Sequence, residues 1–245
     1  MPSIFLSPST QEFNPYIDGG NEEYYMNIIT DALIPYLESS GISYTRNDPQ
    51  KRFSDAVRLS NEGAYDLHLA LHSNAAAGEN AGKIRGSQVY YYPESPEGKR
   101  AADIFADNIT EIYPIPSKVQ TVPTTALGEI IRTKAPAILI EIAYHDNRDD
   151  AMWIRDNIDL IAENLALSVG EFLGVEIVSP NGNVTGVVDT EGGNLNIRAQ
   201  PTVNSDIRGR IPDGTAISIL GKSGDWFLTE YSGIRGYVYG QYIKM

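Results

Sequence analysis

The chain has 245 residues, 42% of them hydrophobic, which is enough for one large domain or for a medium and a small one. Its 32 acidic and 19 basic side chains give a formal net charge of −13. This charge disfavours nucleic acid and anionic membranes as partners, because both need a cationic surface. Without cysteine the chain forms neither a disulfide nor a thiolate site, so His, Asp and Glu are the metal ligands to consider.

No apolar stretch approaches the roughly 18 residues that a membrane-spanning helix needs, so we expect no membrane insertion. Residues 1–9 lack the basic start and the apolar length of a signal peptide. We therefore expect synthesis in the cytoplasm without a signal peptide, even if the target lies elsewhere. The sequence carries no signal for an oligomeric state.

Up to about residue 174, strand-like segments alternate with helix-like segments. Strands are predicted at 4–6, 42–45, 66–72, 88–92 and 138–142. Helices are predicted at 21–38, 49–61, 97–112 and 149–173. Strands alternating with helices predict an α/β domain with a mostly parallel sheet flanked by helices.

After Gly174 the chain changes to short alternating runs separated by glycines, at 195–198, 216–220, 226–231 and 236–239. Runs of this length in so short a segment predict a small all-β barrel. We place the first domain at 1–175, a turn-rich linker at about 176–185 and the second domain at 186–245.

Two of the predicted strands carry all three histidines of the chain. His68 and His72 lie on the strand at 66–72, while Glu141 and His145 belong to the strand at 138–142 and the turn after it. Open α/β sheets place their sites beyond the carboxyl ends of the strands. We therefore expect His72, Glu141 and His145 at one edge of the sheet, and a buried, hydrogen-bonded role for His68.

Residues 186–245 resemble the bacterial SH3-like (SH3b) module. The resemblance is carried by the segments 195–202, 209–215, 225–226 and 236–242. Modules of this family commonly bind cell-wall peptide, so the resemblance implies that this part binds peptidoglycan. We expect Trp226, Tyr237 and Tyr239 to contact the wall, although these aromatic side chains could instead fill the barrel.

Residues 2–173 resemble the zinc-dependent N-acetylmuramoyl-L-alanine amidases of the amidase 3 type. The carrying motifs are Asn21-Glu22 at a helix start, 71–75 after a strand, and 136–141 followed by 146–147. The resemblance implies that Glu22 and His72 bind Zn²⁺ and that Glu141 is catalytic. Among the two adjacent glutamates we prefer Glu22, because its spacing from Ile29 and Leu33 places it on the buried helix face.

The chain departs from that family at the third ligand. A histidine normally follows the first strand, and Ser9 stands at that place here. Because serine is a poor zinc ligand, we expect His145 to complete the site with Glu22 and His72. Asn74 and Arg132 are expected to bind substrate.

The chemistry suits these residues, because a catalytic zinc takes three N or O ligands and activates a water in the fourth position. Glu141 lies between two isoleucines, so burial should raise its pKa and fit it to shuttle protons. A structural ion pair with Arg132 or Lys134 is the other interpretation of Glu141.

The resemblance implies a peptidoglycan hydrolase that cleaves the amide between N-acetylmuramic acid and L-alanine and acts at the bacterial cell wall. Without a signal peptide it would reach the wall after release, as an endolysin does, or by non-standard export, as an autolysin. Two alternatives stay open: a metal-free, amidase-like wall-binding protein, and a zinc peptidase that cuts the stem peptide.

Overall fold

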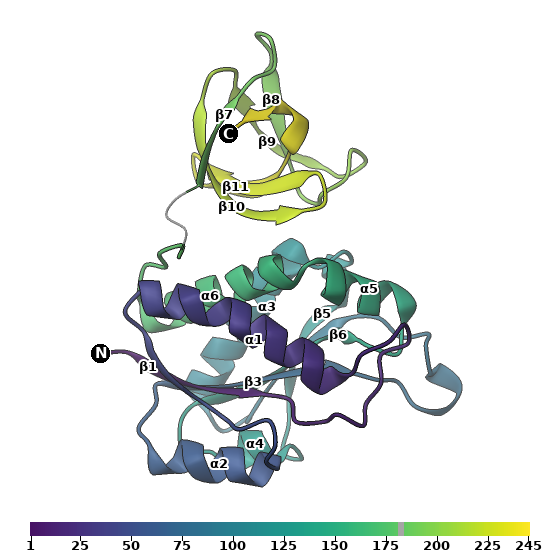
Figure 1. Ribbon diagram of the computed structural model, residues 1–245, viewed down its shortest axis with the longest axis vertical. Helices are drawn as coiled ribbons and strands as arrows, with labels where there is room; N and C mark the ends of the chain where they lie inside the picture. The colour runs from purple at the N-terminus through teal and green to yellow at the C-terminus, as the bar shows by residue number, and fades with distance from the viewer. Residues whose placement is uncertain (181–183) are drawn as a thin grey trace. The chain divides into compact units, whose positions relative to one another are not determined.

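The computed structural model describes residues 1–180 and 184–245 and divides the chain into two units, Met1–Ile177 and Val178–Met245 (Figure 1). The division falls within the predicted linker at 176–185. Residues 181–183 of that linker lie outside the described residues, and the first strand of the second unit begins at Val184. No helix in the described part of the chain is long and apolar enough to cross a membrane.

The first unit is built on one six-stranded sheet. In spatial order its strands are β2 (Ser43–Arg46), β1 (Ser3–Pro8), β3 (Leu67–Asn74), β6 (Ala137–Tyr144), β4 (Ser87–Tyr91) and β5 (Val119–Pro123). All neighbouring strands run parallel except β4 and β6, which run antiparallel. The predicted class, a mostly parallel sheet flanked by helices, is confirmed.

Helices cover both faces of this sheet. One face carries α1 (Glu22–Ser39), α3 (Pro96–Ile112), α5 (Arg148–Asp156) and α6 (Ile158–Leu173), and the other carries α2 (Phe53–Glu62) and α4 (Gly128–Ile131) (Figure 1). The central strands are therefore buried on both sides, and Phe5, Leu69 and Ile140 have no exposed surface. This explains their near-continuous apolar sequences.

The predicted helix at 149–173 is two helices in the structure. Asn157 leaves the helical conformation at φ −130° and ψ 31°, and its side-chain amide donates to the Trp153 carbonyl oxygen at 2.8 Å. Asparagine favours such local hydrogen bonds over helix continuation, so the break follows from its side chain. The helix predicted at 49–61 begins later, at Phe53.

The start of α1 fixes the position of Glu22. Asn21 caps the helix, because its side-chain oxygen accepts a hydrogen bond from the Tyr24 backbone N–H at 2.8 Å. Such a cap stabilises a helix by about 1 kcal/mol. Met26 and Ile29 are fully buried on the same helix. Glu22 therefore lies in the first turn of a well-anchored helix.

Strand register brings His72 and Glu141 together. β3 and β6 are adjacent parallel strands, and His72 pairs directly with Glu141. Both residues lie close to the carboxyl ends of their strands. The site described below is therefore at the edge where an open α/β sheet commonly binds its ligands.

The second unit is an antiparallel sheet of seven strands, as expected for an SH3b module. Its strands, in spatial order, are β13 (Ile243–Lys244), β7 (Val184–Val188), β10 (Ala216–Ser223), β11 (Trp226–Tyr231), β12 (Ile234–Tyr239), β8 (Asn194–Arg198) and β9 (Ile207–Pro212). A cluster of buried aliphatic side chains that includes Leu195, Ile197 and Val238 forms the core. Strands β7, β9 and β13 were not predicted.

Candidate active site

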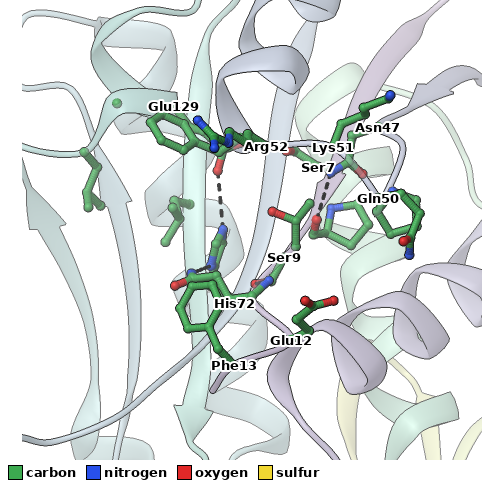
Figure 2. Close-up of a pocket in the computed structure, with 18 residues that line it drawn as sticks. Ser7, Ser9, Glu12, Phe13, Asn47, Gln50, Lys51, Arg52, His72 and Glu129 are labelled. Carbon is green, nitrogen blue, oxygen red and sulfur yellow. Dashed lines mark hydrogen bonds and ion pairs between the residues drawn. The ribbon is translucent and has the colours of Figure 1, made fainter. Parts of the chain in front are cut away.

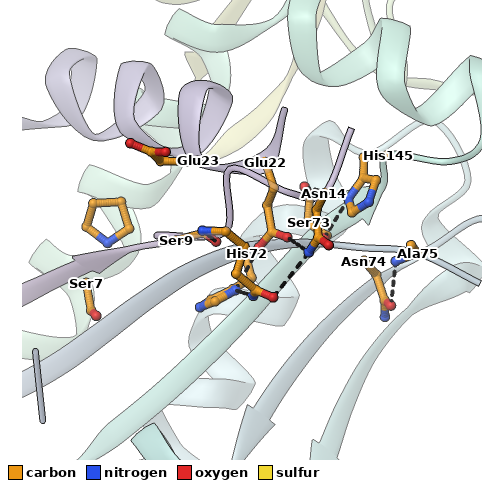
Figure 3. A network of polar contacts seen from close by, with 12 residues as sticks. Ser7, Ser9, Asn14, Glu22, Glu23, His72, Ser73, Asn74, Ala75 and His145 are labelled. Atoms are coloured by element: carbon orange, nitrogen blue, oxygen red, sulfur yellow. Dashed lines mark hydrogen bonds and ion pairs between the residues drawn. The ribbon is translucent and has the colours of Figure 1, made fainter. Parts of the chain in front are cut away.

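His72 lies between two buried carboxylates. Its Nδ1 is 2.8 Å from Glu22 Oε1, and its Nε2 is 3.3 Å from Glu129 Oε2 (Figures 2 and 3). Burial by itself would lower the pKa of the imidazole, yet the hydrogen bonds to Glu129 and Glu22 outweigh it and raise that pKa well above its usual value. The two carboxylates therefore favour the protonated form of the imidazole.

Glu22 is held from two sides. Only 1% of its surface is exposed, and Asn14 Nδ2 donates to its Oε2 at 2.6 Å. Burial would raise the pKa of this carboxyl, but the hydrogen bonds from His72 and Asn14 lower it below its usual value. Glu22 is therefore ionised and fixed in place, as a metal-binding carboxylate must be. Its neighbour Glu23 is only partly buried.

Among the buried carboxyls of the site in the described part of the chain, Glu141 alone has an oxygen without a hydrogen-bond partner. Its Oε2 is buried and makes no hydrogen bond with any described residue. Burial raises the pKa of Glu141 to about 7, although the nearby His72 charge opposes the rise. A carboxyl with this pKa exchanges protons readily near neutral pH.

The structure does not support a structural ion pair for Glu141. Arg132 and Lys134 are both exposed, and Lys134 Nζ donates to the Asn61 carbonyl oxygen at 3.2 Å. Neither cation forms a salt bridge with Glu141 among the described residues. An unpaired buried carboxyl is costly, so its presence indicates a chemical role.

Glu129 was missed by the sequence analysis. It is 5% exposed, accepts the Ser7 hydroxyl, and lies 3.5 Å from His68 Nε2 as well as beside His72. It comes from α4, a helix of one turn that was itself not predicted. The available signal was an acidic residue placed between Leu127 and Ile130 in an apolar segment.

His68 has the buried, hydrogen-bonded role that the sequence predicted. It has no exposed surface, its Nδ1 is 2.9 Å from Ser60 Oγ, and its ring stacks on Phe5 with centroids 5.2 Å apart. Through Glu129 it is linked to His72. The carboxylate thus joins two histidines that are four residues apart on one strand.

The place of the missing third ligand is occupied by the loop after β1. Ser9 is buried, and its Oγ accepts a hydrogen bond from the Gln11 backbone N–H at 3.2 Å. The Gln11 side-chain amide lies 3.3 Å from His72 Nδ1. Asn14 Nδ2 donates to Gln11 Oε1 at 3.2 Å as well as to Glu22. Gln11 and Glu22 therefore meet at the same nitrogen of His72.

The structure does not bring His145 to this cluster. Its Nδ1 is 2.8 Å from the Ser73 carbonyl oxygen and 3.0 Å from Ser73 Oγ, and its ring stacks on Tyr16 (Figure 3). Successive side chains of a strand point to opposite faces, so Ser73 and His145 lie across β3 from His72. Within residues 1–180 and 184–245, no three His, Asp or Glu side chains are placed to hold a metal together.

A cavity of about 640 Å³ opens beside His72 (Figure 2). Its walls are the loop after β1 at 9–13, the loop before α2 at 49–53, and the start of α4. Lys51 and Arg52 are exposed on its wall and bring positive charge to a strongly acidic chain. Arg132 does not line this cavity, and Asn74 donates instead to Gln88 Oε1 at 2.9 Å.

A family model described as N-acetylmuramoyl-L-alanine amidase matches residues 12–171, well over half of the chain. The chain belongs to this amidase family. A second model, described as the bacterial SH3 domain, matches residues 193–244. The amidase match begins after Ser9, so it leaves out the segment in which the family's usual histidine is missing.

Solved structures show the same fold as the amidase unit. N-acetylmuramoyl-L-alanine amidase AmiC2 of Nostoc punctiforme is 19% identical, with a TM-score of 0.63 over 71% of this chain and 97% of that one. An N-acetylmuramoyl-L-alanine amidase from Clostridium difficile 630 is 17% identical, with a TM-score of 0.62 over 71% of this chain and 97% of that one. The catalytic domain of the CD27L endolysin targeting Clostridia difficile is 20% identical, with a TM-score of 0.57 over 70% of this chain and 98% of that one. Among curated proteins, no sequence matches the amidase.

The second unit of the amidase has an aromatic hollow of about 470 Å³ on its surface. Trp226 and Tyr239 line it with ring centroids 5.1 Å apart, and Tyr242, which was not singled out from the sequence, joins them. Tyr237 is fully buried. It therefore has no exposed ring to offer a wall ligand, and we remove it from the expected wall-binding set.

Proposed function

We propose that this amidase is a zinc-dependent peptidoglycan hydrolase that cleaves the amide between the lactyl group of N-acetylmuramic acid and L-alanine. The observation that carries the proposal is the buried, unpartnered Glu141 oxygen next to the His72 and Glu22 pair. Leaving a buried carboxyl oxygen without a partner costs stability, so we expect it where the carboxyl transfers a proton. Here it lies beside the His72 nitrogen and the Glu22 oxygen, two groups able to bind a metal.

The donors present fit a zinc ion. Zinc takes imidazole nitrogen and carboxylate oxygen, and His72 Nδ1 and Glu22 Oε1 face each other at 2.8 Å. When bound there, zinc would polarise the substrate carbonyl and lower the pKa of a water. Glu22 and His72 are the residues that we propose hold it.

For the third donor we propose the side-chain oxygen of Gln11 in place of His145. Two groups, the Glu22 carboxylate and the Gln11 amide, compete for His72 Nδ1 in the structure. A cation among them would satisfy all three, provided that the amide turns its oxygen inward, a rotation that leaves its shape unchanged. Glutamine is an uncommon ligand, so this site should bind zinc more weakly than one with two histidines.

Glu141 handles the protons in this proposal. Its carboxylate accepts a proton from the attacking water and passes it to the leaving amine of L-alanine. We propose that the stem peptide binds in the cavity beside His72, where Lys51 and Arg52 pair with its carboxylates. Glu141 lies outside the lining of this cavity, on the strand next to His72. Asn74 follows His72 by two residues on the same face of β3, which keeps it as a proposed substrate contact. No contact supports Arg132 in that role.

The second unit supplies attachment to the wall. We propose that Trp226, Tyr239 and Tyr242 bind peptidoglycan in their hollow, because accessible aromatic rings in a concave surface are typical ligand contacts. The substrate then places the action of the enzyme at the bacterial cell wall.

The two alternatives differ in what they predict for the purified protein. A metal-free wall-binding protein would contain no zinc and release no fragments, and it would leave the unpartnered Glu141 without a purpose. A zinc peptidase would release fragments cut within the stem. Metal analysis, with mass spectrometry of digested peptidoglycan, separates all three: the amidase releases stem peptides that begin with a free L-alanine amine.

A further inference from the structure

We propose that Glu129 is a positioning residue that orients His72 so that Nδ1 is the metal-binding nitrogen. This inference rests on the proposed zinc site. A metal-binding histidine usually donates its other ring N–H to a carboxylate or carbonyl, which fixes both the tautomer and the orientation of the ring. Glu129 contacts His72 at its other ring nitrogen, Nε2.

The contacts of Glu129 fix its carboxylate in place. Oε1 accepts the Ser7 hydroxyl from β1 and faces His68 Nε2 at 3.5 Å. Oε2 faces His72 Nε2 at 3.3 Å (Figure 2). The Ser7 hydroxyl and the His72 ring, from two adjacent strands, therefore hold one buried carboxylate, and His68 Nε2 lies beside it without a hydrogen bond. A carboxylate in these contacts accepts hydrogen bonds through both of its oxygens.

The backbone of Glu129 is anchored as well. Its carbonyl oxygen accepts the Thr133 hydroxyl at 2.6 Å, and the adjacent Ile130 is 3% exposed in an apolar cluster with Ala70 and Leu139. α4 has only four residues and would have little stability alone. Packing and side-chain bonds thus keep the carboxylate at a set place above β3.

This arrangement decides between the two nitrogens of His72. With Nε2 donating to Glu129, the neutral ring presents the Nδ1 lone pair to the side where Glu22 and Gln11 lie. If the carboxylate were removed, the ring could turn or adopt the other tautomer. The effect would appear as weaker metal binding.

The test uses the full chain and zinc alone as the probe. Wild type, Glu129→Gln and Glu129→Asp are titrated with zinc against a chromophoric chelator, and the histidine ring nitrogens of ¹⁵N-labelled zinc-loaded protein are recorded by NMR. The chain has three histidines, so the spectrum is simple to assign. Glu163→Gln is the matched control, because Glu163 is also a buried glutamate and lies on α6, away from the site.

We expect wild-type His72 to bind zinc through Nδ1 and to carry a proton on Nε2. Glu129→Gln should weaken zinc binding about 10- to 100-fold, the usual loss when the partner of a metal-binding histidine is removed. Glu129→Asp should recover part of the loss, and Glu163→Gln should bind as wild type does.

An affinity of Glu129→Gln equal to that of wild type, or zinc bound through Nε2 of His72, would overturn the inference. If Glu129→Gln fails to fold, the wild-type spectrum still decides, since it needs no variant. Wild-type protein that binds no zinc at all would overturn the proposed function itself, a result distinct from an unaffected variant.

Discussion

Glu22 Oε1 lies 2.8 Å from His72 Nδ1, although 50 positions of sequence separate the two residues. One belongs to the first turn of α1 and the other to the end of β3, so the contact depends on the whole first unit. We propose that these two side chains bind the same zinc ion. Several expected outcomes follow from this pair and its neighbours.

The first concerns the third zinc donor. His72→Ala removes a nitrogen ligand, and Gln11→Ala removes the proposed oxygen ligand, so both should lose zinc affinity. For Gln11→Ala we expect at least about a 10-fold loss, because even indirect partners of a metal cost that much. Zinc titration of purified variants measures this.

His145→Ala is the matched control for Gln11→Ala. Because His145 bonds to Ser73 on the other side of β3, its removal should leave zinc affinity unchanged. Gln11→His should bind zinc more tightly than wild type, since it restores an imidazole donor. Loss of zinc in His145→Ala with none in Gln11→Ala would exclude the proposed ligand set.

The second concerns Glu141 and stability. Its pKa is raised to about 7 from 4.5, so the folded state holds its proton more tightly than the unfolded state. This contribution is fully favourable below about pH 4.5 and is lost as the pH rises through 7. The loss amounts to roughly 3 kcal/mol above pH 7, taking 1.36 kcal/mol per pKa unit.

Glu141→Gln removes that loss, because an amide does not ionise. In zinc-free protein the variant should therefore be more stable than wild type at pH 8, and similar to it at pH 4.5. Chemical denaturation at the two pH values measures the difference. Equal stability of the two proteins at pH 8 would show that Glu141 is not held at a raised pKa.

The third concerns wall binding. Trp226→Ala and Tyr239→Ala each remove an aromatic wall of the surface hollow, and we expect each to weaken sedimentation with purified cell walls about 10-fold. The control is Tyr24→Ala, which removes an aromatic side chain that is 56% exposed on α1 and lines neither the cavity beside His72 nor the hollow. Binding that stays at the wild-type level in both hollow variants would place the wall contact elsewhere.

Much of the first unit could be predicted from sequence, because its strands are buried on both faces and its long helices have clear apolar spacing. His72 and Glu141 could be placed at one edge for the same reason. The helix α4 could not be predicted, because a single turn has no periodicity to detect. Glu129, which lies on α4, was missed for the same reason.

The choice of His145 failed for a different physical reason. The position of His145 in the sequence placed it near the carboxyl edge of the sheet. It could not show on which side of β3 the ring of His145 would lie. The hydrogen bonds to Ser73 and the stacking on Tyr16 decide that side. Tyr237 shows the same limit, because it shares one face of β12 with Tyr239, two residues away, yet Tyr237 is fully buried and Tyr239 only partly.

The central claim is that Glu141 moves protons for amide hydrolysis, and the most direct measurement is the rate at which Glu141→Gln releases stem peptides from purified peptidoglycan. We expect intact folding and zinc binding. The release of new L-alanine amines, followed by mass spectrometry, should be at least about 100-fold slower than in wild type. A variant that releases these fragments at the wild-type rate would contradict it.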